Sequence, residues 1–240
     1  MRQLNLGDRG PEVGYLQRLL NYENLLNGLP EPDLREDCSY GPRTQTRLHN
    51  YQRIIGLPQS DRVDTRMWQQ LGHLIAIDHP VELFPQPTDQ SCWSAAATML
   101  FGDRSVGSGS AALANGHFLD DDPDNVRTFL REQGLTFYDP RNWTIRELIE
   151  MLRNGPLWAA GHWSGRDARG RSTGGGHVVV ISAVWSGQAQ EMGCTAFRIH
   201  DPWPPGRGDI YGAVYEASRF AATVRRGVRF NAGMIALAHR

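Results

Sequence analysis

This sequence of 240 residues contains few cysteines and few long apolar runs, and its net charge is small. The formal net charge is −1 at pH 7, so we expect neither nucleic acid nor an anionic membrane as a partner. No apolar run is long enough to span a bilayer, and the first residues lack the apolar core of a signal peptide. We therefore expect synthesis in the cytoplasm, and work outside the cytoplasm would require a signal-independent secretion system or release by lysis.

The three cysteines are Cys38, Cys92 and Cys194. They can form one disulfide at most, and their spacing lacks the close pairs of a zinc site. We interpret all three as thiols, with a Cys38–Cys194 disulfide left open as the alternative. Composition is otherwise that of an ordinary globular protein, and the length allows one large domain or two smaller ones.

Residues 4–72 carry the pattern of three short helices. The first opens near Pro11, which suits a first helical turn, and the second follows Tyr40-Gly41-Pro42 and stops at Gly56. The third covers Thr65–Leu71 and stops at Gly72. Their apolar residues recur at helical spacing and form a small core. We assign residues 1–73 to this domain. The expected core residues are Val13, Leu16, Leu19, Leu20, Leu48, Tyr51 and Ile55.

The rest of the chain changes from helix signals to strand signals. An extended, proline-containing crossing over 73–85 precedes a second domain, which we place at 80–240. Helices first and strands after predict an α+β domain with a helical half packed on a mostly antiparallel sheet. Glycine and serine over 102–116 predict a surface loop. The expected helices are 92–101, 123–134, 144–155 (with capping-box spacing between Thr144 and Glu147) and 214–220, and the expected strands are 157–163, 177–185, 195–200 and 233–238.

Cys92 stands after a polar turn and at the start of a run of strong helix formers. A thiol at that position meets the N–H groups and the positive dipole end of a helix, which favour the nucleophilic thiolate. The alternative for an isolated cysteine is a buried structural role. A catalytic role requires a base and an orienting group elsewhere in the chain.

His177 is the first candidate for the base because it opens the most apolar strand, directly after Gly174-Gly175-Gly176. His162 is the second choice and His200 the third, and each also fits a histidine that merely ends a buried strand. Asp201 ends the following strand, and neighbouring strands lie about 5 Å apart, so its carboxylate can reach an imidazole on the next strand. Its alternative is an aspartate that starts a turn before proline.

Gln86 lies six residues before Cys92, and its side-chain amide is a candidate donor to the oxyanion of an acyl-transfer intermediate. Gln90 is the fallback. A metal site made from Cys92, His177 and Asp201 together with His162 has suitable atoms but lacks a close ligand pair, so we expect neither a metal nor another cofactor.

Two resemblances join these observations. In residues 4–72, Leu-Gly-Asp-Arg-Gly-x-x-Val-x-x-Leu-Gln, Tyr-Gly-Pro-x-Thr, Tyr-Gln-Arg-x-x-Gly-Leu and Thr-x-x-Trp-x-x-Leu resemble the three-helix peptidoglycan-binding domain of bacterial cell-wall enzymes. The segment 23–37 is longer and more acidic than in that family, and Tyr40 and Tyr51 replace the usual phenylalanines. A helical docking domain without affinity for the wall is the alternative.

Over about 80–238, Gln-x5-Cys-Trp-Ser-Ala-Ala, Gly-Gly-Gly-His-Val-Val-Val-Ile and Ile-His-Asp-Pro-Trp resemble papain-like cysteine peptidases. The compact bacterial branch, with secreted effector proteases and bacteriocin-processing peptidases, is the most similar. The resemblance implies Cys92 as nucleophile, His177 as base and later acid, Asp201 as orienting group and Gln86 as oxyanion donor.

Together these features predict a wall-directed cysteine hydrolase that cleaves amide bonds of peptidoglycan peptides as an antibacterial effector or lysin. The expected partners are peptidoglycan or its stem peptides and a cognate immunity protein. One alternative is a papain-like protease that cleaves a protein and docks through its N-terminal domain. Another is an inactive wall-binding protein.

Overall fold

The structure is a computed structural model that describes residues 1–102, 119, 123–141, 143–166, 172–187, 192–216, 219–224 and 228–240. The chain forms two compact units, each made of two segments. Unit 1 contains Met1–Ala76 and Val184–Ala196, and unit 2 contains Ile77–Ala183 and Phe197–Arg240. The sequence predicted domains of 1–73 and 80–240, which leave 184–196 in the second domain, whereas the compact units place these residues with the N-terminal helices.

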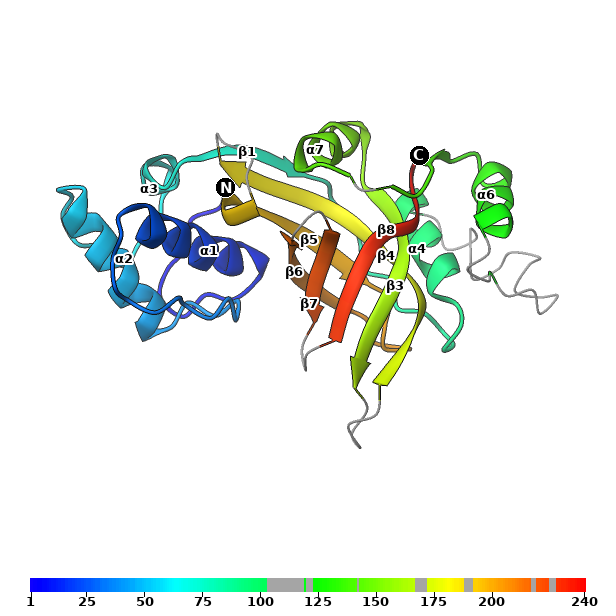
Figure 1. Cartoon of the computed structure of the whole chain (residues 1–240), viewed down its shortest axis with the longest axis horizontal. Helices are drawn as coiled ribbons and strands as arrows, with labels where there is room; N and C mark the ends of the chain where they lie inside the picture. Colours follow the sequence, from blue (N-terminus) through cyan, green and yellow to red (C-terminus); the bar gives the residue numbers. More distant parts are fainter. Residues whose placement is uncertain are drawn as a thin grey trace. The chain divides into compact units, whose positions relative to one another are not determined.

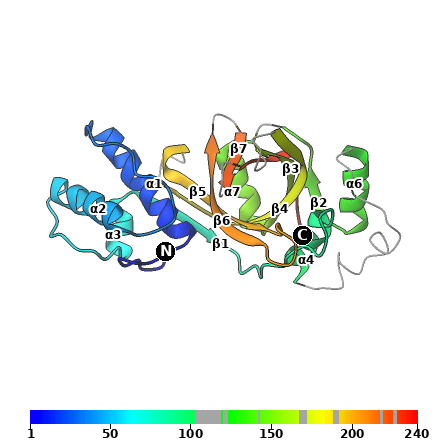
Figure 2. The same ribbon diagram turned by 90° about the horizontal axis from the view of Figure 1, so that it is seen from below.

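The three predicted helices of unit 1 are α1 (Pro11–Leu26), α2 (Pro42–Ile54) and α3 (Thr65–Gln70). They lie together in Figures 1 and 2. Proline occupies the first turn of α1 and of α2, where its missing N–H would have had no helical partner. The apolar faces meet in a core whose fully buried members include Val13, Leu16, Leu19, Leu48 and Trp68.

The long acidic segment that follows α1 is fixed to that helix by side-chain amides. The amide of Asn21 donates to the Leu34 carbonyl at 2.9 Å and accepts from the Leu34 N–H at 2.7 Å. Gln17, which is 2% exposed, donates to the Ser39 carbonyl and accepts from the Cys38 N–H, each at 3.1 Å. These bonds give backbone groups of an irregular segment the partners that a helix or sheet would otherwise supply.

Residues 184–196 join unit 1 through aromatic packing. The ring of Trp185 lies 6.1 Å from that of Tyr15, which in turn stacks on Trp68 at 5.8 Å between centroids. Gly193, in the short helix η1 (Met192–Cys194), leaves no room for a side chain, because a Cβ atom there would lie 2.4 Å from Cδ2 of Tyr22. This segment is therefore shaped to fit against α1.

Unit 2 begins its helical half with α4 (Cys92–Phe101), which starts at the predicted cysteine and ends at Gly102 in the left-handed conformation. The next helices are α6 (Pro123–Glu132) and α7 (Ile145–Asn154). The Thr144–Glu147 capping box is formed as predicted. Of the expected loop at 102–116, residues 103–116 lie outside the described residues. Among the described residues, every helix is too short or too polar to cross a bilayer.

The strands form a mostly antiparallel sheet in the order β1-β4-β3-β8-β7-β6-β5, and a further pairing of β4 with β5 closes a ring (Figure 1). The short strand β2 pairs with β8. This α+β architecture is the predicted one. The strands are β1 (His73–Asp78), β2 (Thr136–Tyr138), β3 (Leu157–Arg166), β4 (Ser172–Gly187), β5 (Thr195–Asp201), β6 (Asp209–Glu216), β7 (Arg219–Val224) and β8 (Val228–His239).

The helix predicted at 214–220 is wrong. Residues Val214, Tyr215 and Glu216 end β6 and pair with Ala221, Phe220 and Arg219 of β7. This segment is short and has mixed polarity, so the local pattern does not separate helix from strand. The hydrogen-bonding edges of β5 and β8 decide the outcome, because β6 pairs with β5 and β7 pairs with β8.

Aromatic side chains fix α4 to the sheet. Trp93 packs edge-on against Phe129 of α6, with 4.9 Å between ring centroids. The indole N–H of Trp158 on β3 donates to the Trp93 carbonyl at 3.1 Å, and both tryptophans are almost fully buried. Because Trp93 is adjacent to Cys92, this packing also sets the position of the thiol.

Candidate active site

The site contains a histidine between a carboxylate and a thiol. His177 Nε2 lies 2.7 Å from Asp201 Oδ1, and the two side chains are 10% and 7% exposed. The imidazole also hydrogen-bonds the side chain of Cys92. Since Nε2 faces Asp201, Nδ1 is the nitrogen left for the thiol. The structure therefore brings together Cys92, His177 and Asp201, the residues to which the sequence analysis assigned the roles of nucleophile, base and orienting group.

The imidazole is held in its charged form. Burial alone lowers the pKa of His177, but the hydrogen bonds and charges of Asp201 and Cys92 outweigh it and raise the pKa from 6.5 to about 10. An imidazolium next to a thiol favours ionisation of that thiol, which is the reactive form. The arrangement can therefore supply a cysteine nucleophile and an imidazolium proton donor.

Local sequence explains the place of each group. Cys92 is the first residue of α4, and Ser91 before it gives the helix no side-chain cap, since its hydroxyl donates to the Thr88 carbonyl at 3.0 Å. Because Ser91 does not cap the helix, its side chain bonds none of the first N–H groups of α4. Opposite His177 on β3 stands Gly161, so that position adds no side chain beside the imidazole.

Asp201 is held by more than the imidazole. Its Oδ1 also accepts from the Trp203 backbone N–H at 2.9 Å, and its Oδ2 accepts from the Tyr211 hydroxyl at 3.1 Å. The sequence interpretation did not include Tyr211. The wrong helix at 214–220 hid the strand that carries it, and only the pairing of β6 with β5 indicates that Tyr211 lies near Asp201.

Gln86 lies beside the segment that follows Asp201. Its backbone N–H donates to the Pro202 carbonyl and its carbonyl accepts from the Gly206 N–H, each at 3.0 Å. The side chain is fully buried, and Nε2 donates to the Thr88 carbonyl at 2.6 Å. An amide nitrogen carries two hydrogens, and the bond to Thr88 uses one of them. The fallback, Gln90, is exposed, and its carbonyl accepts from the Trp93 indole.

The other histidine candidates lie apart from this arrangement. His162 is exposed on β3 opposite Gly176. His200 is 3% exposed, and neither of its ring nitrogens has a hydrogen-bond partner. Burial and the nearby Arg198 charge lower the pKa of His200 to about 4, against a smaller opposing effect of Asp78. It is therefore a neutral core histidine at physiological pH.

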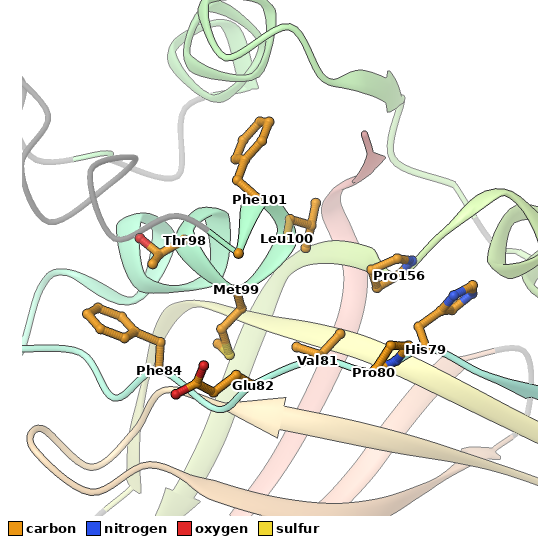
Figure 3. A pocket seen from close by; sticks show the side chains of 11 residues that line it. His79, Pro80, Val81, Glu82, Phe84, Thr98, Met99, Leu100, Phe101 and Pro156 are labelled. Atoms are coloured by element: carbon orange, nitrogen blue, oxygen red, sulfur yellow. The ribbon is translucent and has the colours of Figure 1, made fainter.

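A cavity of about 390 Å³ lies at the other end of α4 (Figure 3). Met99, Leu100 and Phe101 contribute to its wall, together with the chain from His79 to Glu82. At a helical rise of about 1.5 Å per residue, Met99 lies roughly 10 Å along the axis from Cys92. The three groups of the candidate site do not line this cavity.

The residues also limit what the site can hold. Cys38, Cys92 and Cys194 are all thiols, so the alternative of a Cys38–Cys194 disulfide is not realised. Within the described parts of the chain, no three histidine, cysteine or acidic side chains are grouped so that they could hold a metal ion. Cys92 and His177 themselves offer nucleophilic and acid–base chemistry.

Comparison with known families agrees with this chemistry. Residues 73–218, more than half of the chain, match the family described as papain-like cysteine protease AvrRpt2. The matched segment contains Cys92, His177 and Asp201, while the helices α1, α2 and α3 lie outside it. A search of curated proteins returns no match.

Proposed function

Because the chain belongs to the papain-like cysteine protease family of AvrRpt2, we propose that Cys92, His177 and Asp201 hydrolyse an amide bond through an acyl-enzyme. The observation that carries the proposal is the continuous contact from the thiol through the imidazole to the buried carboxylate. That order matches the requirement for a nucleophile, a proton-transfer group and an orienting group.

In the proposed reaction the Cys92 thiolate attacks the carbonyl carbon of the scissile amide. The negative charge that forms on the carbonyl oxygen is stabilised by the Cys92 backbone N–H and the remaining N–H of Gln86. His177, as imidazolium, then gives its proton to the leaving amine while the C–N bond breaks. In the second half, neutral His177 removes a proton from water, the resulting hydroxide attacks the thioester, and the Cys92 thiolate leaves.

For the substrate, we propose peptidoglycan stem peptides or cross-bridges. The support is the order of the four motifs in residues 4–72, which resembles a wall-binding domain. Such a domain would raise the local concentration of wall substrate and compensate for a weakly binding active site. An antibacterial effector or a lysin would combine these properties, and a cognate immunity protein would then be its partner in the producing cell.

Digestion of purified sacculi tests this substrate. Wild type and Cys92→Ala would be incubated with sacculi, and the muropeptides identified by mass spectrometry. We expect shortened stem peptides or opened cross-links with the wild type alone. Identical intact muropeptides in both digests would contradict the wall substrate.

A protein substrate is the second candidate, and the family match favours it because the matched family is described as a protease. In that case the N-terminal helices would serve as a docking module. A peptide library would be digested in parallel with the sacculi, again with Cys92→Ala as the control. Cleavage of peptides together with intact muropeptides would select the protein substrate.

A further inference from the structure

Tyr211 contacts the one oxygen of the Asp201 carboxylate that the imidazole does not use. His177 and the Trp203 N–H both bond to Oδ1, and the Tyr211 hydroxyl donates to Oδ2 at 3.1 Å. The carboxylate is buried, so water is a poor replacement for a missing donor.

The register of β5 and β6 brings the two side chains together. Asp201 lies opposite Asp209, and Ile199 lies opposite Tyr211. Tyr211 and Asp201 are thus diagonal neighbours on one face of the sheet, at a separation that an aromatic side chain can span. The contact follows from strand pairing and does not depend on a mobile surface side chain.

Tyr211 remains protonated at working pH. Burial, followed by the charge of Asp201, raises the pKa of this phenol well above its usual value of 10. The hydroxyl therefore keeps its hydrogen and acts as a donor over the whole range in which the site would work.

We propose that Tyr211 is a positioning residue of the catalytic machinery, acting through Asp201 to orient the His177 imidazole toward the Cys92 thiol. The proposal rests on the proposed function. A carboxylate bonded through Oδ1 alone can rotate about its Cβ–Cγ bond, and the bond from Tyr211 to Oδ2 fixes the plane of the group. The plane of the carboxylate in turn fixes the direction in which Oδ1 accepts from the imidazole.

The rate of Cys92 alkylation by iodoacetamide, followed by mass spectrometry from pH 5 to 9, tests the proposal without knowledge of the substrate. We expect Tyr211→Phe to lower the rate at pH 6 by about 3- to 30-fold relative to the wild type, because fewer molecules hold the reactive ion pair. The matched control is Tyr138→Phe, which removes the hydroxyl that bonds His239 Nδ1 at 3.1 Å and should leave the rate unchanged.

A double-mutant cycle separates positioning from a general effect on the fold. In an Asp201→Ala background, adding Tyr211→Phe should change the rate by less than about twofold, because the hydroxyl has no carboxylate to orient. An equal loss in both backgrounds would overturn the proposal, and so would a wild-type rate for Tyr211→Phe. Thermal unfolding checks that each variant folds, and Tyr211→Met provides the same comparison if the Phe variant does not.

The pH profile of wild-type Cys92 alkylation distinguishes failure of the proposed function from failure of the role proposed for Tyr211. Reaction of wild-type Cys92 only above about pH 8.5, as for an ordinary thiol, would remove the proposed function itself. Rapid reaction at pH 6 in both the wild type and Tyr211→Phe would leave the proposed function intact and refute the role of Tyr211.

Discussion

Removal of the Asp201 carboxylate should both inactivate the thiol and destabilise the fold in a pH-dependent way. In Asp201→Ala, His177 loses its partner at 2.7 Å, and the Trp203 N–H and the Tyr211 hydroxyl lose their acceptor. The lowering of the His177 pKa by burial is then opposed by Cys92 alone. We expect a mostly neutral imidazole at pH 7, which no longer favours the thiolate.

The magnitude follows from the His177 pKa. A rise from 6.5 to about 10 corresponds to roughly 5 kcal/mol of imidazolium stabilisation, at about 1.36 kcal/mol per pKa unit. Loss of one partner from a buried ion pair typically costs about 3–5 kcal/mol, which is the same order. Because the folded-state pKa is raised, this stability is fully present below pH 6.5 and is lost as the pH rises through about 10.

Urea unfolding at pH 6 and pH 9.5 measures this effect. We expect Asp201→Ala to lose about 3–5 kcal/mol at pH 6 and clearly less at pH 9.5. Asp201→Asn keeps an acceptor oxygen without the charge and should lie between the wild type and the alanine variant. Asp209→Asn on β6, opposite Asp201, is the matched control and should behave as the wild type. A destabilisation of equal size at both pH values would refute the assigned ion pair.

Three further predictions concern other groups. Gln86→Ala should lower kcat about 10²- to 10³-fold while Cys92 alkylation at pH 6 stays unchanged, and a parallel loss of alkylation would indicate a structural role instead. His200 has its pKa lowered to about 4, so wild-type stability should fall by roughly 3 kcal/mol as the pH drops from 6.5 to 4, at about 1.36 kcal/mol per pKa unit. His200→Leu should remove most of this fall in urea titrations. Thr144→Ala breaks the capping box with Glu147 and should cost about 1 kcal/mol, seen as a Tm lower by roughly 2–4 °C.

The candidate site was predictable because each of its groups has a local signal. Cys92 follows a polar turn and opens a run of helix formers, His177 opens an apolar strand, and Asp201 ends one before proline. Such signals depend on a few neighbouring residues, and α4 and β5 formed where they were expected. The strand of His177 was predicted to open at that residue, whereas β4 begins at Ser172, so His177 lies inside the strand. Their order also matches a recognisable family pattern.

Two features depended on contacts between distant parts of the chain. Tyr211 belongs to the site only because β6 pairs with β5 in a particular register, and nothing in its neighbouring residues indicates a bond to Asp201. Trp185 packs on Tyr15 of α1, although its own sequence continues an apolar strand. In both cases tertiary pairing decides the role of a residue whose local pattern is ambiguous.

The central claim is that Cys92 is an activated nucleophile, and the wild-type protein itself allows the most direct test. All three thiols would be alkylated with limiting iodoacetamide at pH 6, and the modified peptides quantified by mass spectrometry, with Cys38 and Cys194 as internal references. We predict that Cys92 is modified at least tenfold faster than either reference and that its rate changes little between pH 6 and 8. A Cys92 rate that matches the references and rises only above about pH 8.5 would contradict the account.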